Sequence, residues 1–370
     1  MTIHSQIKLE ADTAGDEQDW ALGPGSVTWK MLRDPVVYML GQMRNSALLL
    51  MHPPFAASAE HDTFTIDPVL RFRRVGMYAY SVTFGTKADA ERLSHMVRTR
   101  HNQVVGTEPI TRRPYQSHSE YELALTHVIQ ASSYLAIYEA IYGELPTEER
   151  DQYYQEQKVP SAQIGVNPDY LPNTYEEAEL FLAQARKRFA VGERGRELLA
   201  AYDNSPYPAG TYMGDLPYFK RNLALYAMRV VIDMAIETIH DDYRLILAIN
   251  RRPKLRSRWA VRASLKLFSK FMRSKKGQVY WSEYLQKRAF DIFTTALGAE
   301  DAPGYEQRKK AFRVPDAKQF YHELPDLKRN WPGDVADYAV GREVEGDITL
   351  DETPAVNQRD PSKHLQQDAA

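Results

Sequence analysis

Apolar residues recur every three or four positions along most of this chain, which is the spacing of one buried face on an α-helix. Strict alternation of apolar and polar residues, which would indicate half-buried strands, is scarce. Ser26 is placed to cap a first helix, and Asp34-Pro35 separates it from a second. The pattern predicts further helices over residues 67–83, 87–105, 119–142, 218–249, 259–272 and 276–297. We therefore predict an all-α fold.

The apolar segments follow one another from residue 21 to residue 335, which predicts a single large helical domain. Residues 1–20 are polar, and we expect them to form a flexible N-terminus. Residues 336–370 are rich in Asp, Glu, Gln, Pro and Thr, and we expect a disordered acidic tail there. Hydrophobic residues make up 43% of the chain and charged residues 26%, so the domain can bury a sizeable core.

Composition and charge exclude several classes of protein. The chain has no cysteine, which rules out disulfides, iron–sulfur clusters and thiolate zinc sites. The net charge of −2 argues against a broad nucleic-acid-binding surface. No segment reaches roughly 18 consecutive apolar residues, and the polar N-terminus lacks the apolar stretch of a secretory signal. We therefore expect a cytoplasmic protein with no membrane span and no nucleic-acid partner.

His101 is the most informative of the ten histidines. On the helix expected over residues 87–105 it lies four positions after Val97, on an apolar stripe that also includes Leu93. His95 lies on a polar side of the same helix and should be solvated. An imidazole on a buried stripe is either a core histidine bonded to a backbone carbonyl or a metal ligand. With no cysteine and no second His four residues away, a metal here is expected to belong to a cofactor and not to a zinc site.

His127 and Arg71 are further candidates, and the spacing leaves two interpretations open for each. His127 lies in the long helix expected over residues 119–142, which is apolar almost all round and therefore central to the fold. It is either a core residue or the donor of a hydrogen bond that orients a metal ligand. Arg71 shares an apolar stripe with Val75 and Tyr78. It either extends to the domain surface or lies beside a bound anion.

No nucleotide-binding, zinc-protease or serine-hydrolase motif occurs in the chain. The segment His240-Asp241-Asp242 carries side chains that can bind metals. Because it has one histidine and no spaced partner, we interpret it as a helix boundary.

Several short motifs follow one another in a recognisable order. They are Gly25-Ser26-Val27-Thr28-Trp29, Leu50-Met51-His52-Pro53, Asp67-Pro68-Val69-Leu70-Arg71-Phe72-Arg73-Arg74, Thr83-Phe84-Gly85-Thr86 and residues 97–106. The ordered series resembles the catalytic domain of the rubber oxygenases, or latex-clearing proteins, a family that also contains a fungal oxygenase of the mycophenolic-acid pathway.

This resemblance implies a helical fold of the rubber-oxygenase type with a globin-like core, and b-type haem held between helices. It implies that His101 ligates the haem iron and that Arg71 lies on the opposite face. In the latex-clearing members a Lys and a Thr follow that arginine three and four residues later, where this chain has Arg74 and Val75. A guanidinium essentially never loses its proton, so Arg74 is not expected to ligate iron, and Val75 lacks the hydroxyl.

The resemblance and the pattern together favour a haem b-dependent oxygenase that acts on a small apolar metabolite with dioxygen. Arg71 and Arg74 are the expected catalytic residues, on the distal side or at the propionates. His101, Arg71, Val75 and His127 are the expected haem-binding residues, with His101 on the iron. Two alternatives remain: a haem protein of another type, peroxidase-like or a haem or gas binder, and a helical interaction protein without a cofactor. The sequence leaves the oligomeric state open.

Overall fold

The computed structural model describes residues 19–61, 68–110, 112–204, 209, 213–247, 258–301 and 303–322. The expected N-terminal segment lies almost wholly outside these residues, and the expected acidic tail lies wholly outside them. Within the described part, helices dominate, and the one sheet has two short strands, which confirms the predicted all-α single domain. None of the described helices combines the length and apolar character that crossing a membrane requires.

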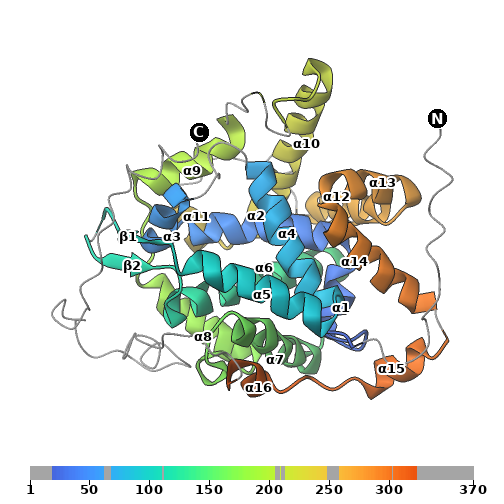
Figure 1. The fold of residues 1–370 in the computed structure, drawn as a ribbon. Helices are drawn as coiled ribbons and strands as arrows, with labels where there is room; N and C mark the ends of the chain where they lie inside the picture. Colours follow the sequence, from blue (N-terminus) through green and yellow to red (C-terminus); the bar gives the residue numbers. More distant parts are fainter. Residues whose placement is uncertain are drawn as a thin grey trace, which may run out of the picture.

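The elements follow one another as short and medium helices (Figure 1). The α-helices are α1 (Val27–Leu32), α2 (Pro35–Leu49), α3 (Pro53–Ser58), α4 (Pro68–Phe84), α5 (Lys87–His101), α6 (Glu120–Tyr142), α7 (Thr147–Gln163), α8 (Tyr175–Arg186), α9 (Glu193–Asn204), α10 (Tyr218–Glu237), α11 (Asp241–Ile246), α12 (Arg258–Met272), α13 (Lys275–Tyr284), α14 (Lys287–Gly298), α15 (Tyr305–Ala311) and α16 (Ala317–His322). The strands are β1 (Val105–Thr107) and β2 (Pro114–Gln116), and single 3₁₀ turns lie at Ala59–His61, Pro168–Tyr170 and Ala299–Asp301.

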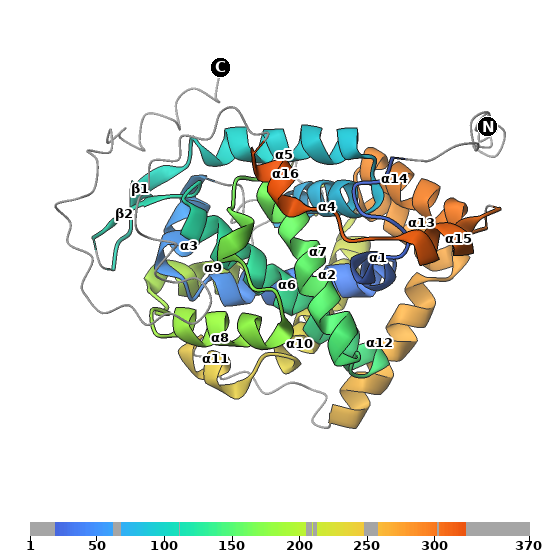
Figure 2. The same cartoon turned by 90° about the horizontal axis from the view of Figure 1, so that it is seen from below.

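The centre of the molecule is the packed pair α2 and α6, which the other helices surround (Figures 1 and 2). Helix α6 begins where the sequence predicts, since the Ser119 hydroxyl accepts a hydrogen bond from the Glu122 amide at 3.3 Å. It ends at Gly143, whose φ of 95° is the left-handed conformation that glycine adopts readily. The two helices approach closely at Gly41, where a Cβ would lie 2.3 Å from the Tyr134 ring.

Local signals also set the starts of the first helices. The Ser26 hydroxyl caps α1 by accepting from the Trp29 amide at 3.1 Å, as predicted. The Asp34 carboxylate caps α2 in the same way at the Val36 amide, 3.0 Å away. The Pro53-Pro54 pair begins the short helix α3, because proline is favoured in the first turn of a helix, where no amide donor is needed.

The fold differs from the expected pattern at the end of α5. The apolar spacing predicted a helix as far as residue 105, but α5 ends at His101. Val105–Thr107 instead forms strand β1, which pairs antiparallel with β2 so that Val105 lies opposite Gln116. Pairing within this local β-hairpin therefore replaces the last helical turn, and His101 becomes the final residue of its helix.

The C-terminal half contains more breaks than the apolar spacing predicts. The helix expected over residues 218–249 is divided into α10 and α11. His240 lies between them and caps α11, with its Nδ1 accepting from the Asp242 amide at 3.3 Å, which confirms the interpretation of this segment as a helix boundary. The helix expected over residues 276–297 is likewise divided into α13 and α14.

Candidate functional site

His101 lies at the C-terminal end of α5 with its ring partly buried. The ring nitrogen Nδ1 is fully enclosed and has no hydrogen-bond partner in the part of the chain that the structure describes. Burial, together with the positive charge of Arg71 and the neighbouring His118, lowers the pKa of His101 to about 4. The ring is therefore neutral at pH 7, which is the form that can ligate a metal.

Three other segments meet at this end of α5. Arg71 comes from the first turn of α4, and its guanidinium carbon lies 5.8 Å from the centre of the Phe55 ring of α3. His118 comes from the turn after β2, and its ring bonds to the main chain of His101. Burial lowers the pKa of His118 as well. The fold thus brings the His118 imidazole and the Arg71 guanidinium close to His101, with the Phe55 ring against Arg71.

The other predicted residues of α4 are placed differently from Arg71. Arg74 is exposed to solvent, one turn along the helix. Val75 is partly buried on the same stripe as Arg71. Of these side chains, Arg71 is the one whose charge lowers the pKa of His101. On the neighbouring helix, His95 is exposed as the sequence predicts.

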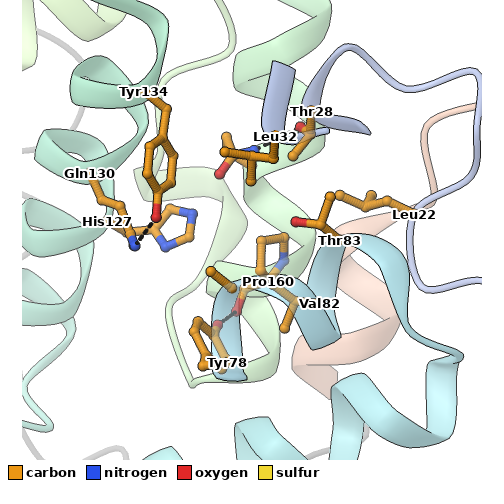
Figure 3. Close-up of a pocket in the computed structure, with 12 residues that line it drawn as sticks. Leu22, Thr28, Leu32, Tyr78, Val82, Thr83, His127, Gln130, Tyr134 and Pro160 are labelled. Atoms are coloured by element: carbon orange, nitrogen blue, oxygen red, sulfur yellow. Dashed lines mark hydrogen bonds between the residues drawn. The ribbon is translucent and has the colours of Figure 1, made fainter. Parts of the chain in front are cut away.

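His127 lies in separate surroundings in the middle of α6. It is 6% exposed, and burial lowers its pKa to about 4, while hydrogen bonding to Gln157 of α7 opposes this effect. Its Nε2 has no partner among the described residues. His127 lines a small cavity of about 20 Å³, across which Tyr78 faces Gln130 and Tyr134 (Figure 3). This volume suits one water molecule and is far too small for a porphyrin. A role of His127 in orienting a ligand stays a prediction.

The sequence pattern gave no indication of a buried pair formed by His52 and Glu122. Their Nε2 and Oε2 atoms are 2.6 Å apart, and His52 is 5% exposed. The rings of Tyr121 and Phe189 pack beside the imidazole. Because the two residues are 70 positions apart, no short-range spacing could have revealed this pair.

Glu156 is a second buried carboxylate that spacing alone did not identify. It accepts hydrogen bonds from the Val27 and Thr28 amides, both at 2.8 Å, and from the Thr28 hydroxyl at 2.7 Å. Gln152 adds a fourth bond at 2.8 Å. Burial nevertheless raises the pKa of Glu156 to about 7. These contacts join α7 to the start of α1, so Glu156 stabilises the packing of these two helices.

The donor set around His101 fits a haem. Haem iron needs only one or two protein ligands, so a single neutral imidazole is sufficient. A guanidinium beside it is the side chain that pairs best with a propionate carboxylate. Among the described residues there is no group of three His, Asp or Glu side chains that could hold a metal ion by themselves. A haem does not need such a group.

Comparison with known protein families gives one match. Residues 29–273, which are more than half of the chain, match the family described as ER-bound oxygenase mpaB/B′/rubber oxygenase, catalytic domain. The matched segment includes α4, α5 and α6, and with them every residue discussed around His101. Searches of curated proteins and of solved structures give no match.

Proposed function

Because the chain belongs to the mpaB/rubber oxygenase catalytic-domain family, a family of oxygenases, we propose that it is a haem b-dependent oxygenase with His101 as its iron ligand. The observation that carries the proposal is a neutral imidazole with an enclosed, unbonded nitrogen at the end of α5, beside Arg71. When bound, haem supplies the dioxygen chemistry that protein side chains lack.

Each residue around the proposed site has a distinct task. His101 offers a lone pair at neutral pH, since the folded protein holds its pKa well below 7. Arg71 provides a fixed positive charge and a fork of N–H donors, which suits a propionate or a polar substrate group. The Phe55 ring holds the Arg71 guanidinium on one side. These contacts orient Arg71 before any ligand arrives.

The two departures from the latex-clearing pattern limit what this site does. Arg74 is exposed, and a guanidinium is not an iron ligand, so we do not expect Arg74 to occupy an iron coordination position. Val75 has no hydroxyl with which to hydrogen-bond dioxygen or a substrate. Arg71 is therefore the main polar group that α4 offers here. We infer that the substrate is a small or medium-sized apolar metabolite, because Phe55 contacts Arg71 and Val75 follows Arg71 on the same helix stripe, and both side chains are apolar and partly buried.

The proposal is tested by adding haem to the purified protein and recording the absorption spectrum. We expect an intense Soret band that shifts or disappears in His101→Ala and is restored when imidazole is added to His101→Gly. His95→Ala is the matched control, because His95 lies on the same helix but is exposed. A Soret band that is the same in wild type and His101→Ala contradicts the proposal.

Two further measurements separate the proposal from the alternatives. Oxygen consumption with apolar candidate substrates distinguishes an oxygenase from a peroxidase-like protein or a haem or gas binder. Iron analysis of the protein from cells distinguishes all of these from a helical interaction protein, for which iron would be near zero.

A further inference from the structure

Helices α12 and α13 form a basic surface on a chain whose overall net charge is −2. From residue 258 to residue 284, the span of both helices, the sequence has seven Lys and Arg and one Glu, Glu283. The two helices pack against each other and lie at the edge of the molecule in both views (Figures 1 and 2). The β1–β2 hairpin lies next to the end of α5, where His101 is located. In Figure 1, α12 and α13 lie on the opposite side of the molecule from this hairpin. This surface is therefore separate from the His101 site.

The inner face of α12 is firmly held, which fixes the direction of its outer face. Leu265, Ser269 and Met272 are at most 1% exposed. The Ser269 hydroxyl donates to the Asp34 carboxylate at 2.5 Å, and Tyr142 donates to the same carboxylate at 2.7 Å. Because α12 cannot rotate without breaking these bonds, the residues opposite them remain turned toward solvent.

The outer face combines positive charge with large apolar side chains. We define the α12–α13 face by Arg262, Lys266, Leu267, Lys270, Phe271 and Val279. Leu267 is 71% exposed, Phe271 48% and Val279 62%. On an α-helix, Leu267 and Phe271 are four residues apart and form one stripe, directly beside the stripe of Arg262, Lys266 and Lys270.

The positive charges of this face are not neutralised within the described part of the chain. No carboxylate there forms an ion pair with Arg262, Lys266 or Lys270. Elsewhere on the surface such pairs are common, as between Arg288 and Asp89 at 2.6 Å. An exposed apolar stripe is typical of an interaction surface, and the hydrated cations beside it favour a partner that is both apolar and anionic.

We propose that the α12–α13 face docks on the surface of an anionic phospholipid bilayer. Lys and Arg at the edge of the face bind the headgroup phosphates, while Leu267 and Phe271 enter the boundary of the acyl chains. A nucleic acid would use the charges but offers no apolar layer to Leu267 or Val279. A second copy of the chain, related by a two-fold axis, would place like charges opposite each other.

The first test is sedimentation with vesicles of phosphatidylcholine mixed with phosphatidylglycerol, and with vesicles of phosphatidylcholine alone. The full chain should bind only the anionic vesicles, and added salt should weaken the binding. The double variant Lys266→Glu/Lys270→Glu should bind at least about 25-fold more weakly, at about fivefold per lysine. Leu267→Ser/Phe271→Ser should bind at least about 10-fold more weakly with an unchanged dependence on salt.

The matched controls carry the same chemical changes on other exposed helices. Lys309→Glu/Lys310→Glu on α15 and Leu180→Ser on α8 should bind like wild type. Circular dichroism and thermal unfolding check that each variant is folded. Equal weakening by the controls and the α12–α13 variants would overturn the proposal, because it would show a general charge effect.

A second readout uses the absence of cysteine from the chain. Leu267→Cys carries one environment-sensitive dye, and Leu180→Cys serves as its control. A blue shift of the Leu267 label on adding anionic vesicles, with none for Leu180, supports the proposal.

A label already blue-shifted without vesicles would show that another segment or a second copy covers this face. Preferential binding to duplex DNA through the same lysines would show a nucleic-acid surface. Either of these two results overturns the proposal. None of the measurements on this surface depends on haem, so failure of the membrane proposal can be distinguished from failure of the oxygenase proposal.

Discussion

Two buried histidines of this protein share nearly the same local chemistry but lie in different environments. His101 and His127 both have a pKa lowered to about 4, and each has one enclosed ring nitrogen without a hydrogen-bond partner among the described residues. His101 ends its helix, remains partly exposed and faces Arg71. His127 lies in mid-helix beside Gln157 and a cavity that suits one water molecule.

The difference shows that burial and a lowered pKa do not identify a ligand by themselves. Any imidazole enclosed in apolar surroundings loses its charge, whatever its role. What distinguishes His101 is its place at the end of a helix, its partial exposure and a neighbouring guanidinium that suits an anionic partner. Substitutions at His101, His127 and the two arginines of α4 test this distinction.

Replacing His101 should have the largest effect on haem binding. We expect His101→Ala to weaken haem affinity at least about 100-fold, which corresponds to about 2.7 kcal/mol, because the iron loses its protein ligand. Titration of the protein with haem, followed at the Soret band, measures this. His127→Ala should change the affinity less than about threefold. A loss of about 10- to 100-fold in His127→Ala would instead support the prediction that His127 orients the ligand.

His127→Ala should act on stability and not on haem binding. The substitution removes a packed ring and its contact with Gln157, so we expect the free energy of unfolding to fall by about 2–3 kcal/mol. Urea unfolding of the protein without haem measures it. The exposed His95→Ala should change that free energy by no more than about 0.5 kcal/mol. Equal stabilities of wild type and His127→Ala would show that His127 is not a structural residue.

The pH dependence of stability should reveal the neutral state of His127. Its pKa is about 4 in the folded protein and about 6.5 when unfolded, so between these values the unfolded chain binds more protons. The stabilisation is complete above pH 6.5 and is lost as the pH falls toward 4, by about 2 kcal/mol at pH 5. His127→Gln should lose less stability than wild type over this range in urea unfolding. Identical pH profiles would contradict the burial of a neutral ring.

The two arginines of α4 should differ in their effect on haem binding. Arg71→Leu should weaken haem affinity by about tenfold, or 1.4 kcal/mol, because a carboxylate partner loses its cation. Arg74→Leu is the matched control and should leave the affinity unchanged, since Arg74 is exposed. The same Soret titration measures both. Equal losses would place Arg74 at the haem and remove the distinction drawn between these side chains.

Much of the fold follows from local sequence signals. The limits of α6 were predicted because Ser119 and Gly143 act through their own backbone neighbours. The breaks at Asp34-Pro35 and the boundary at His240 follow from the same kind of local chemistry. Helical spacing alone predicts the inward position of His101, because it shares an apolar stripe with residues three and four positions apart.

Other features depended on contacts between distant residues. The end of α5 was predicted too late, because β1 pairs with a strand that the helical spacing did not reveal. Spacing placed Arg71 on an apolar stripe, and the resemblance alone set it opposite His101. Packing of α4 against α5 brings its charge within reach of that ring. His118 and the His52–Glu122 pair could not be predicted, since their partners lie 17 and 70 residues away.

The helices, most of their caps and the candidate histidine could be predicted from the chain alone, because hydrogen bonds and side-chain spacing within a few residues decide these features. The residues that neighbour His101, and the arginine whose charge acts on it, were set by tertiary packing. Those arrangements depend on how separate helices pack, and packing brings together residues whose positions in the chain carry no shared pattern.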